Sequence, residues 1–115
     1  MLKLSRSSVA ALALMVVASA AAAQEIARAP LEPMDQAIAD EARIRTLETT
    51  PSRVRVSWHG VTAGVNGGIE PLRTYLARNG MMCREFEETT QLPDQALVVN
   101  RLACRDDKGR WHIVR

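Results

Sequence analysis

The sequence predicts an all-β fold: a small antiparallel meander of about five strands, curled over one core and preceded by a short N-terminal helix. Residues 53–59 alternate apolar and polar side chains, as a half-buried strand does. Residues 96–105 are rich in β-branched and aliphatic side chains and follow turn chemistry at Leu92–Gln95. A second turn, Asp106–Gly109, leads into an apolar stretch at 110–114. Together these patterns predict consecutive antiparallel strands.

The N-terminal segment, residues 1–23, has the pattern of a secretory signal. Lys3 and Arg6 precede an apolar run, and small residues end at Ala23. A membrane-spanning helix is the alternative, but it needs about 20 apolar residues and a longer apolar run than this one. We therefore expect export and cleavage after Ala23. The residue directly after the cleavage site is Gln24 and not a cysteine, so we expect no lipid attachment there and at most a peripheral association with the outer membrane.

The charge balance argues against a nucleic-acid partner. The chain has 15 basic and 13 acidic residues, and the predicted signal carries two of the basic residues and none of the acidic ones. The remainder has 13 of each and lacks the positive field that nucleic-acid binding requires. We divide it into a flexible leader at 24–33, which holds two prolines, and one small domain at 34–115.

The domain is expected to start with a helix at 34–49. Apolar residues recur at near-helical spacing from Met34, with Asp35 as the predicted N-cap and Pro51 as the stop. The apolar stripe is thin and rich in alanine, so the helix either packs on the sheet or extends to a partner. The four glycines within residues 60–68 predict a loop.

The expected core consists of apolar residues that the strand pattern places on one face. These residues are Val54, Val56, Trp58, Ile69, Leu102, Trp111 and Ile113. The two tryptophans, Trp58 and Trp111, are the largest of them, so we expect them to dominate the core.

The two cysteines are predicted to form a disulfide. If residues 92–95 form the hairpin loop, Gln91 faces Ala96, and the same register places Cys83 opposite Cys104. Directly opposed residues of this kind lie about 4.5–5.5 Å apart, which a disulfide tolerates. Two free thiols are the alternative, but export to an oxidising compartment favours the bond.

Three short segments at this spacing resemble a known family. They are Gly80-x-x-Cys83-Arg84-Glu85-Phe86, Ala103-Cys104-Arg105 and Gly109-x-Trp111-x-Ile113-Val114. With Trp58 and Tyr75 upstream, they resemble the C-terminal domain of the bacterial outer-membrane surface antigens typified by the rickettsial surface antigen. The resemblance covers about residues 38 to 115.

The resemblance implies a strand where the residues alone allow two structures. Ile69, Leu72 and Leu76 have helical spacing, whereas Asn79-Gly80 is a strong hairpin signal. The family pattern treats this stretch as a strand leading into the cysteine strand, so we predict a strand at 68–77.

Side chains that could perform chemistry are few. The two histidines, His59 and His112, alternate with core residues and are expected to face solvent. With the two cysteines they lack the close spacings of a zinc site. The acidic cluster could offer paired carboxylates for acid–base work, but arginines on the hairpin are placed to pair with it. The cluster is Glu85, Glu87 and Glu88, and the arginines are Arg84, Arg101 and Arg105. We expect no catalytic site, no metal and no cofactor.

These features together favour an exported, non-catalytic cell-envelope protein of the periplasm or outer membrane. Such a protein would act as a structural or interaction module toward an envelope component that the sequence does not identify. The alternative is a periplasmic inhibitor or ligand-binding module, in which the loop at 60–68 and the helix form a recognition edge.

Overall fold

The computed structural model describes residues 31–115. The predicted signal at 1–23 and the predicted leader up to residue 30 lie outside the described residues. The elements are α2 (Pro33–Thr49), β1 (Val56–His59), β2 (Asn66–Leu76), β3 (Met82–Gln91), β4 (Ala96–Arg105) and β5 (Trp111–Ile113). The five strands form one sheet in chain order with every neighbouring pair antiparallel, which confirms the predicted meander.

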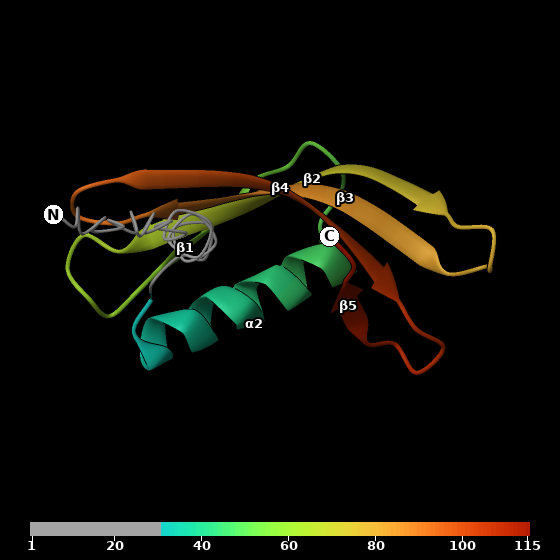
Figure 1. Ribbon diagram of the computed structural model, residues 1–115, viewed down its shortest axis with the longest axis horizontal. Coiled ribbons are helices and arrows are strands. Elements are labelled where there is room, and N and C mark those ends of the chain that lie inside the picture. Colours follow the sequence, from blue (N-terminus) through green and yellow to red (C-terminus); the bar gives the residue numbers. More distant parts are fainter. Residues whose placement is uncertain (1–30) are drawn as a thin grey trace, which may run out of the picture.

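Helix α2 lies along one face of this sheet, which we call the inner face (Figure 1). The short strand β5 lies beside the C-terminal end of α2, and the tip of the β2–β3 hairpin projects beyond the helix. The opposite, outer face carries no second layer within residues 31–115. Of the two placements left open for the helix, packing on the sheet is therefore the one that the structure shows.

The helix begins at Pro33, with Glu32 as the N-cap residue, so the prediction that Asp35 is the N-cap is wrong. Proline suits the first helical position because its fixed φ is helical and its missing N–H would have no intrahelical partner. Asp35 lies one turn further in and hydrogen-bonds to a different segment, as described below. The helix ends at Thr49, before Pro51, as expected.

The ambiguous stretch after residue 69 is a strand, as predicted, because β2 continues to Leu76. The first strand starts at Val56 rather than at residue 53. Arg53 has a positive φ of 72°, and its N–H donates to the carbonyl oxygen of Pro71 at 2.7 Å, so the chain is still turning there.

The loop predicted at 60–68 ends before Asn66, because Asn66–Gly68 belong to β2. Gly67 must be glycine here, since a Cβ atom would lie 2.6 Å from the indole of Trp58 and 2.3 Å from the carbonyl oxygen of Thr89. The glycine thus lets the indole pack directly on the sheet backbone.

The core lies between α2 and the inner face. Its buried apolar residues are Ala39, Leu47, Trp58, Val65, Ile69, Phe86, Leu92 and Ala103. Trp58 and Ile69 are where the sequence predicts them, and Phe86, fully buried at the centre of β3, is a core residue that the pattern missed.

Five predicted core residues need correction. Val56, on β1, is only partly buried and lies outside the core cluster. Val54 and Ile113 are 48% and 43% exposed, because one precedes β1 and the other lies on a three-residue edge strand. Leu102 lies two residues from Cys104 on β4 and therefore shares the outer face with it. Trp111 packs against the core cluster but is only partly buried, since it lies at the margin beside the end of α2.

The hairpin register is the predicted one, with Gln91 opposite Ala96 and Cys83 opposite Cys104. The two sulfur atoms are 2.05 Å apart and the Cα atoms 4.0 Å apart, so the predicted disulfide is present. Arg84 and Phe86 face the helix, so strand alternation places the disulfide on the outer face.

Candidate functional site: the cleft between α2 and the β3–β4 hairpin

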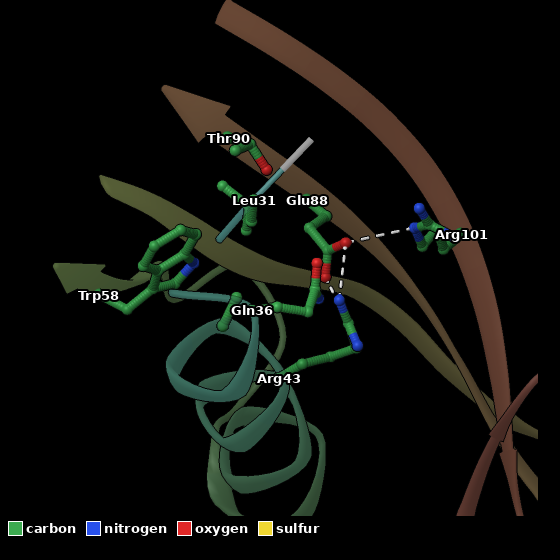
Figure 2. Close-up of a pocket in the computed structure, with 8 residues that line it drawn as sticks. Leu31, Gln36, Arg43, Trp58, Glu88, Thr90 and Arg101 are labelled. Atoms are coloured by element: carbon green, nitrogen blue, oxygen red, sulfur yellow. Dashed lines mark hydrogen bonds and ion pairs between the residues drawn. The ribbon is translucent and has the colours of Figure 1, made fainter. Parts of the chain in front are cut away.

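The largest concentration of charge on the inner face lies around Glu88 of β3 (Figure 2). Arg43 of α2 donates to both carboxylate oxygens of Glu88, with Nη2 3.1 Å from Oε1. From the other side Arg101 of β4 places its Nε 3.3 Å from the same Oε1. The carboxylate is therefore held between one guanidinium from the helix and one from the sheet.

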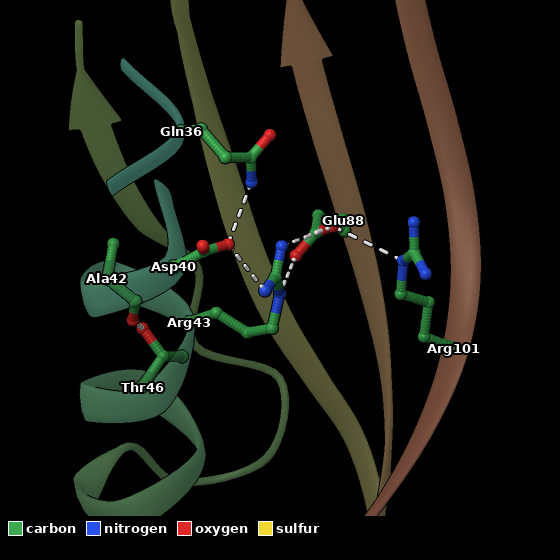
Figure 3. Close-up of polar contacts among 7 residues, drawn as sticks. All are labelled: Gln36, Asp40, Ala42, Arg43, Thr46, Glu88 and Arg101. Atoms are coloured by element: carbon green, nitrogen blue, oxygen red, sulfur yellow. Dashed lines mark hydrogen bonds and ion pairs between the residues drawn. The ribbon is translucent and has the colours of Figure 1, made fainter. Parts of the chain in front are cut away.

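The ion pairing extends along the helix (Figure 3). Nη1 of Arg43 donates to Asp40 Oδ1 at 2.9 Å, and the side-chain amide of Gln36 donates to the same oxygen at 2.8 Å. Burial alone would lower the pKa of Arg43, but pairing with Glu88 and then Asp40 raises it above its ordinary value. Arg43 is consequently a permanent cation that joins α2 to β3.

A cavity of about 290 Å³ lies beside this ion-paired cluster. Leu31, Ala39 and Trp58 form its apolar wall, and the cluster around Glu88 forms its polar wall (Figure 2). Trp58 is only 5% exposed, so its ring packs in the core and is not available to stack against a ligand from solvent. The cleft is thus a small, mixed space in which the charged side chains pair with one another, although the buried Nε of Arg101 makes an ion pair and no hydrogen bond.

At the other end of the helix, Arg84 of β3 caps the last turn of α2. Its guanidinium donates to the carbonyl oxygens of Leu47 and Thr50, each at 2.7 Å, and its Nε donates to Thr74 Oγ1 at 2.8 Å. The last turn of α2 contains no basic residue of its own, so the sheet supplies the cation that a helix C-terminus favours. Burial lowers the pKa of Arg84, which is only 6% exposed.

Glu48 anchors the same end of the helix to the C-terminal strands. Arg105 donates to both of its carboxylate oxygens, at 3.0 and 3.1 Å, and the indole N–H of Trp111 donates to it at 2.7 Å. The hydrogen bond from Trp111 and then those from Arg105 hold the pKa of Glu48 below its usual range. This contact explains why Trp111 lies at the margin of the core, where its polar N–H has a partner.

Asp35 anchors the N-terminal end of the helix to the loop after β1. Its Oδ1 accepts from the backbone N–H groups of Val61 at 2.6 Å and Thr62 at 3.3 Å. The Thr62 side chain and these two N–H groups hold the pKa of Asp35 below its usual range despite its burial. Gly60 is needed here, because a Cβ atom would lie 2.6 Å from Asp35 Oδ1.

The structure corrects the predicted pairing of the hairpin charges. Of the arginines placed to pair with the acidic cluster, only Arg101 does so, through Glu88. Arg84 and Arg105 reach α2 instead, and Glu85 pairs with Arg73 of β2 at 3.1 Å. Strand pairing alone could not reveal these contacts with the helix. The one available signal was that the last turn of α2 contains no basic residue, so a cation from another element was needed there.

The histidines remain apart from this cluster. His59 and His112 are exposed, and Nε2 of His112 lies 2.7 Å from Asp106 Oδ2 in the β4–β5 turn. Hydrogen bonding from His112, followed by the N–H of Arg110, strongly lowers the pKa of Asp106. Among residues 31–115, no group of three His, Cys, Asp or Glu side chains is arranged to hold a metal ion.

The described part of the chain also contains no helix that is both long and apolar enough to cross a membrane. Residues 31–115 thus form a small disulfide-bonded sheet with one helix packed on it. Charged side chains of the helix and of the sheet join the two layers. Their chemistry is that of ion pairs and helix caps.

Comparison with known proteins identifies the family to which this chain belongs. Residues 45–112, more than half of the chain, match the family described as the 17 kDa outer membrane surface antigen, and the chain belongs to this family. The match confirms the resemblance inferred from the cysteine, arginine and tryptophan segments.

Among the curated relatives is the 17 kDa surface antigen of Rickettsia japonica, which is 31% identical over 86 residues, covering 75% of this chain and 54% of the relative. The 17 kDa surface antigen of Rickettsia felis is 31% identical over 84 residues, covering 73% of this chain and 53% of the relative. The chain thus spans about half the length of the curated relatives it matches. No solved structure matches it.

Proposed function

We propose that this protein is an exported, non-catalytic component of the cell envelope that acts as a structural or interaction module. The observation that carries the proposal is the ion pairing on the inner face. Glu88, whose side chain is only 12% exposed, accepts from Arg43 and lies against Arg101. A general acid or base needs a group that can donate a proton to a substrate or accept one from it, whereas this carboxylate is committed to joining α2, β3 and β4.

Family membership supports the envelope location. The relatives bear the name surface antigen, and the family description reads outer membrane surface antigen. The disulfide between Cys83 and Cys104 agrees with folding in an oxidising compartment outside the cytoplasm. The predicted signal at residues 1–23 provides the route of export.

Fractionation of cells that produce the full chain tests this proposal. We expect the protein to sediment with outer membranes after lysis and to be released by high salt, as a peripherally held protein would be. Protein found in the cytoplasm with residues 1–23 retained would contradict the export that the proposal requires.

A second candidate, a periplasmic ligand-binding or inhibitor module, is favoured by one other cavity. A space of about 320 Å³ lies between the start of α2, the loop that contains Thr62 and the β3–β4 turn at Pro93. The space lies where the sequence suggested a recognition edge, between the loop at 60–68 and the helix. Complete release in the osmotic-shock fluid, without sedimentation in the membrane fraction, would favour this candidate over the first.

A further inference from the structure

The first half of β4 has a free edge within the described residues. Strand β5 pairs only with Ala103–Arg105, and Leu102 completes the pairing by exchanging backbone hydrogen bonds with Val114 and Arg115 at 2.8 and 2.7 Å. Before Leu102, no strand or loop of residues 31–115 pairs with this side of β4, whose first half lies clear of β5 in Figure 1.

Strand geometry shows which groups face the open side. The N–H and C=O of Leu102 point toward β5, and this direction repeats every second residue along a strand. The backbone groups of Ala96, Val98 and Asn100 therefore point outward from the edge. Such a row of unpaired donors and acceptors is a template for another strand.

This edge lacks the features by which proteins protect free edges. Residues 96–100 contain no charged residue and no proline, their pairing with β3 is regular, and Val98 is 62% exposed. The part of β2 that extends beyond β1 is different. It carries Pro71, a register shift between Pro71 and Arg73, and the exposed charge of Arg73. The free part of β2 is thus protected against pairing, whereas the free half of β4 is not.

We propose that the free edge of β4 pairs with the same edge of a second copy of this chain, antiparallel about a two-fold axis at Val98. In this register Val98 faces Val98, Ala96 faces Asn100 on both sides of the axis, and Leu97 faces Val99. The outward N–H and C=O groups then bond in reciprocal pairs. The two sheets join into one continuous sheet with both helices on the same face.

The second copy is favoured because the edge is complementary to itself. Apolar residues meet apolar ones, no like charges face each other, and Arg101 faces Gln95 beside the acidic Asp94 of the other copy's turn. The partly buried Leu97 and Val99 become covered. A symmetric contact of this kind closes as a dimer rather than a fibre, and its small area makes the dimer weak.

Sedimentation velocity of the chain from residue 24, over about 10 to 500 µM, is expected to show a concentration-dependent monomer–dimer equilibrium. Hydrogen exchange adds the location: the outward-facing amides of Ala96, Val98 and Asn100 should exchange more slowly as the concentration rises, whereas amides of the opposite edge strand β1 should not change. A monomer at every concentration, or protection confined to other segments, overturns the proposal.

The matched variants are Val98→Lys and Val98→Thr. Lysine places two like charges against each other at the axis and should weaken dimerisation by about tenfold or more, whereas threonine keeps a neutral β-branched side chain and should not. Circular dichroism melting checks that both variants fold. Equal dimerisation of the two variants rejects this interface. The chain from residue 24 is also compared with a chain from residue 31. If only the shorter chain dimerises, residues 24–30 prevent pairing at this edge, and the proposal is rejected for the protein itself.

Discussion

The two faces of the sheet are stabilised by different means. The inner face holds α2 through a buried apolar cluster centred on Phe86 and through the caps and ion pairs of Arg84 and Glu88. The outer face has no covering layer in the described part of the chain, and its central feature is the disulfide between Cys83 and Cys104. A small domain that buries one face only has a limited core, and a covalent bond on the other face offsets that limit.

The largest expected effect concerns the inner face. Phe86→Ala should lower the free energy of unfolding by about 3–5 kcal/mol, because it removes a fully buried ring from the middle of the core. The neighbouring Glu87→Ala, on the outer face of the same strand, should change it by less than about 0.5 kcal/mol. Urea unfolding followed by circular dichroism measures both. A larger loss for Glu87→Ala than for Phe86→Ala would mean that the faces are assigned the wrong way round, and similar losses would mean that Phe86 is not a core residue.

The next effect concerns the outer face. Replacing both Cys83 and Cys104 by alanine should cost about 3 kcal/mol, as expected for a bond that closes a loop between residues 21 apart. Each single replacement should cost about as much as the double one, since all three break the same bond. A thiol assay on the folded, exported protein provides the check. Two reactive thiols there would show that the bond does not form.

A matched pair of arginines compares the faces directly. Arg84→Met should cost about 2–3 kcal/mol, because it leaves the last carbonyl groups of α2 without their buried donor. Arg73→Met, on the outer face, removes an exposed pair with Glu85 and should cost about 0.2–1 kcal/mol. Thermal unfolding at pH 7 measures the difference. If the two losses were equal, the cap by Arg84 would contribute no more than a surface ion pair.

The smallest effect is a dependence on pH at the two ends of α2. The pKa values of Asp35 and Glu48 are lowered in the folded state, so the unfolded chain binds more protons in acid. Their contribution to stability is present above about pH 4 and is lost as the pH falls below it. Melting temperatures of the wild type and of Asp35→Asn should therefore converge between about pH 5 and pH 2. A constant difference across this range would show that the charge of Asp35 does not stabilise the fold.

Local patterns were enough to predict much of this molecule. The order of the strands, the Leu92–Gln95 turn, the register of the hairpin and the position of the disulfide all depend on residues close in sequence. Each of these features is decided by strand alternation, turn chemistry and the length of one loop, and such information is present in a short segment.

The contacts of the helix with the sheet were decided only by the tertiary structure. Arg84 and Arg105 were predicted to pair within the hairpin, but they bind the C-terminal end of α2, and Arg43 pairs with Glu88 45 residues away. Asp35 is of a residue type that favours the N-cap position, but its carboxylate instead accepts a hydrogen bond from the backbone N–H of Val61 in the loop after β1. A charged side chain has several partners within its reach along the sequence. Which of them it meets depends on where the helix lies on the sheet, and that position is set by the packing of Phe86, Leu47 and Trp58 between the two layers.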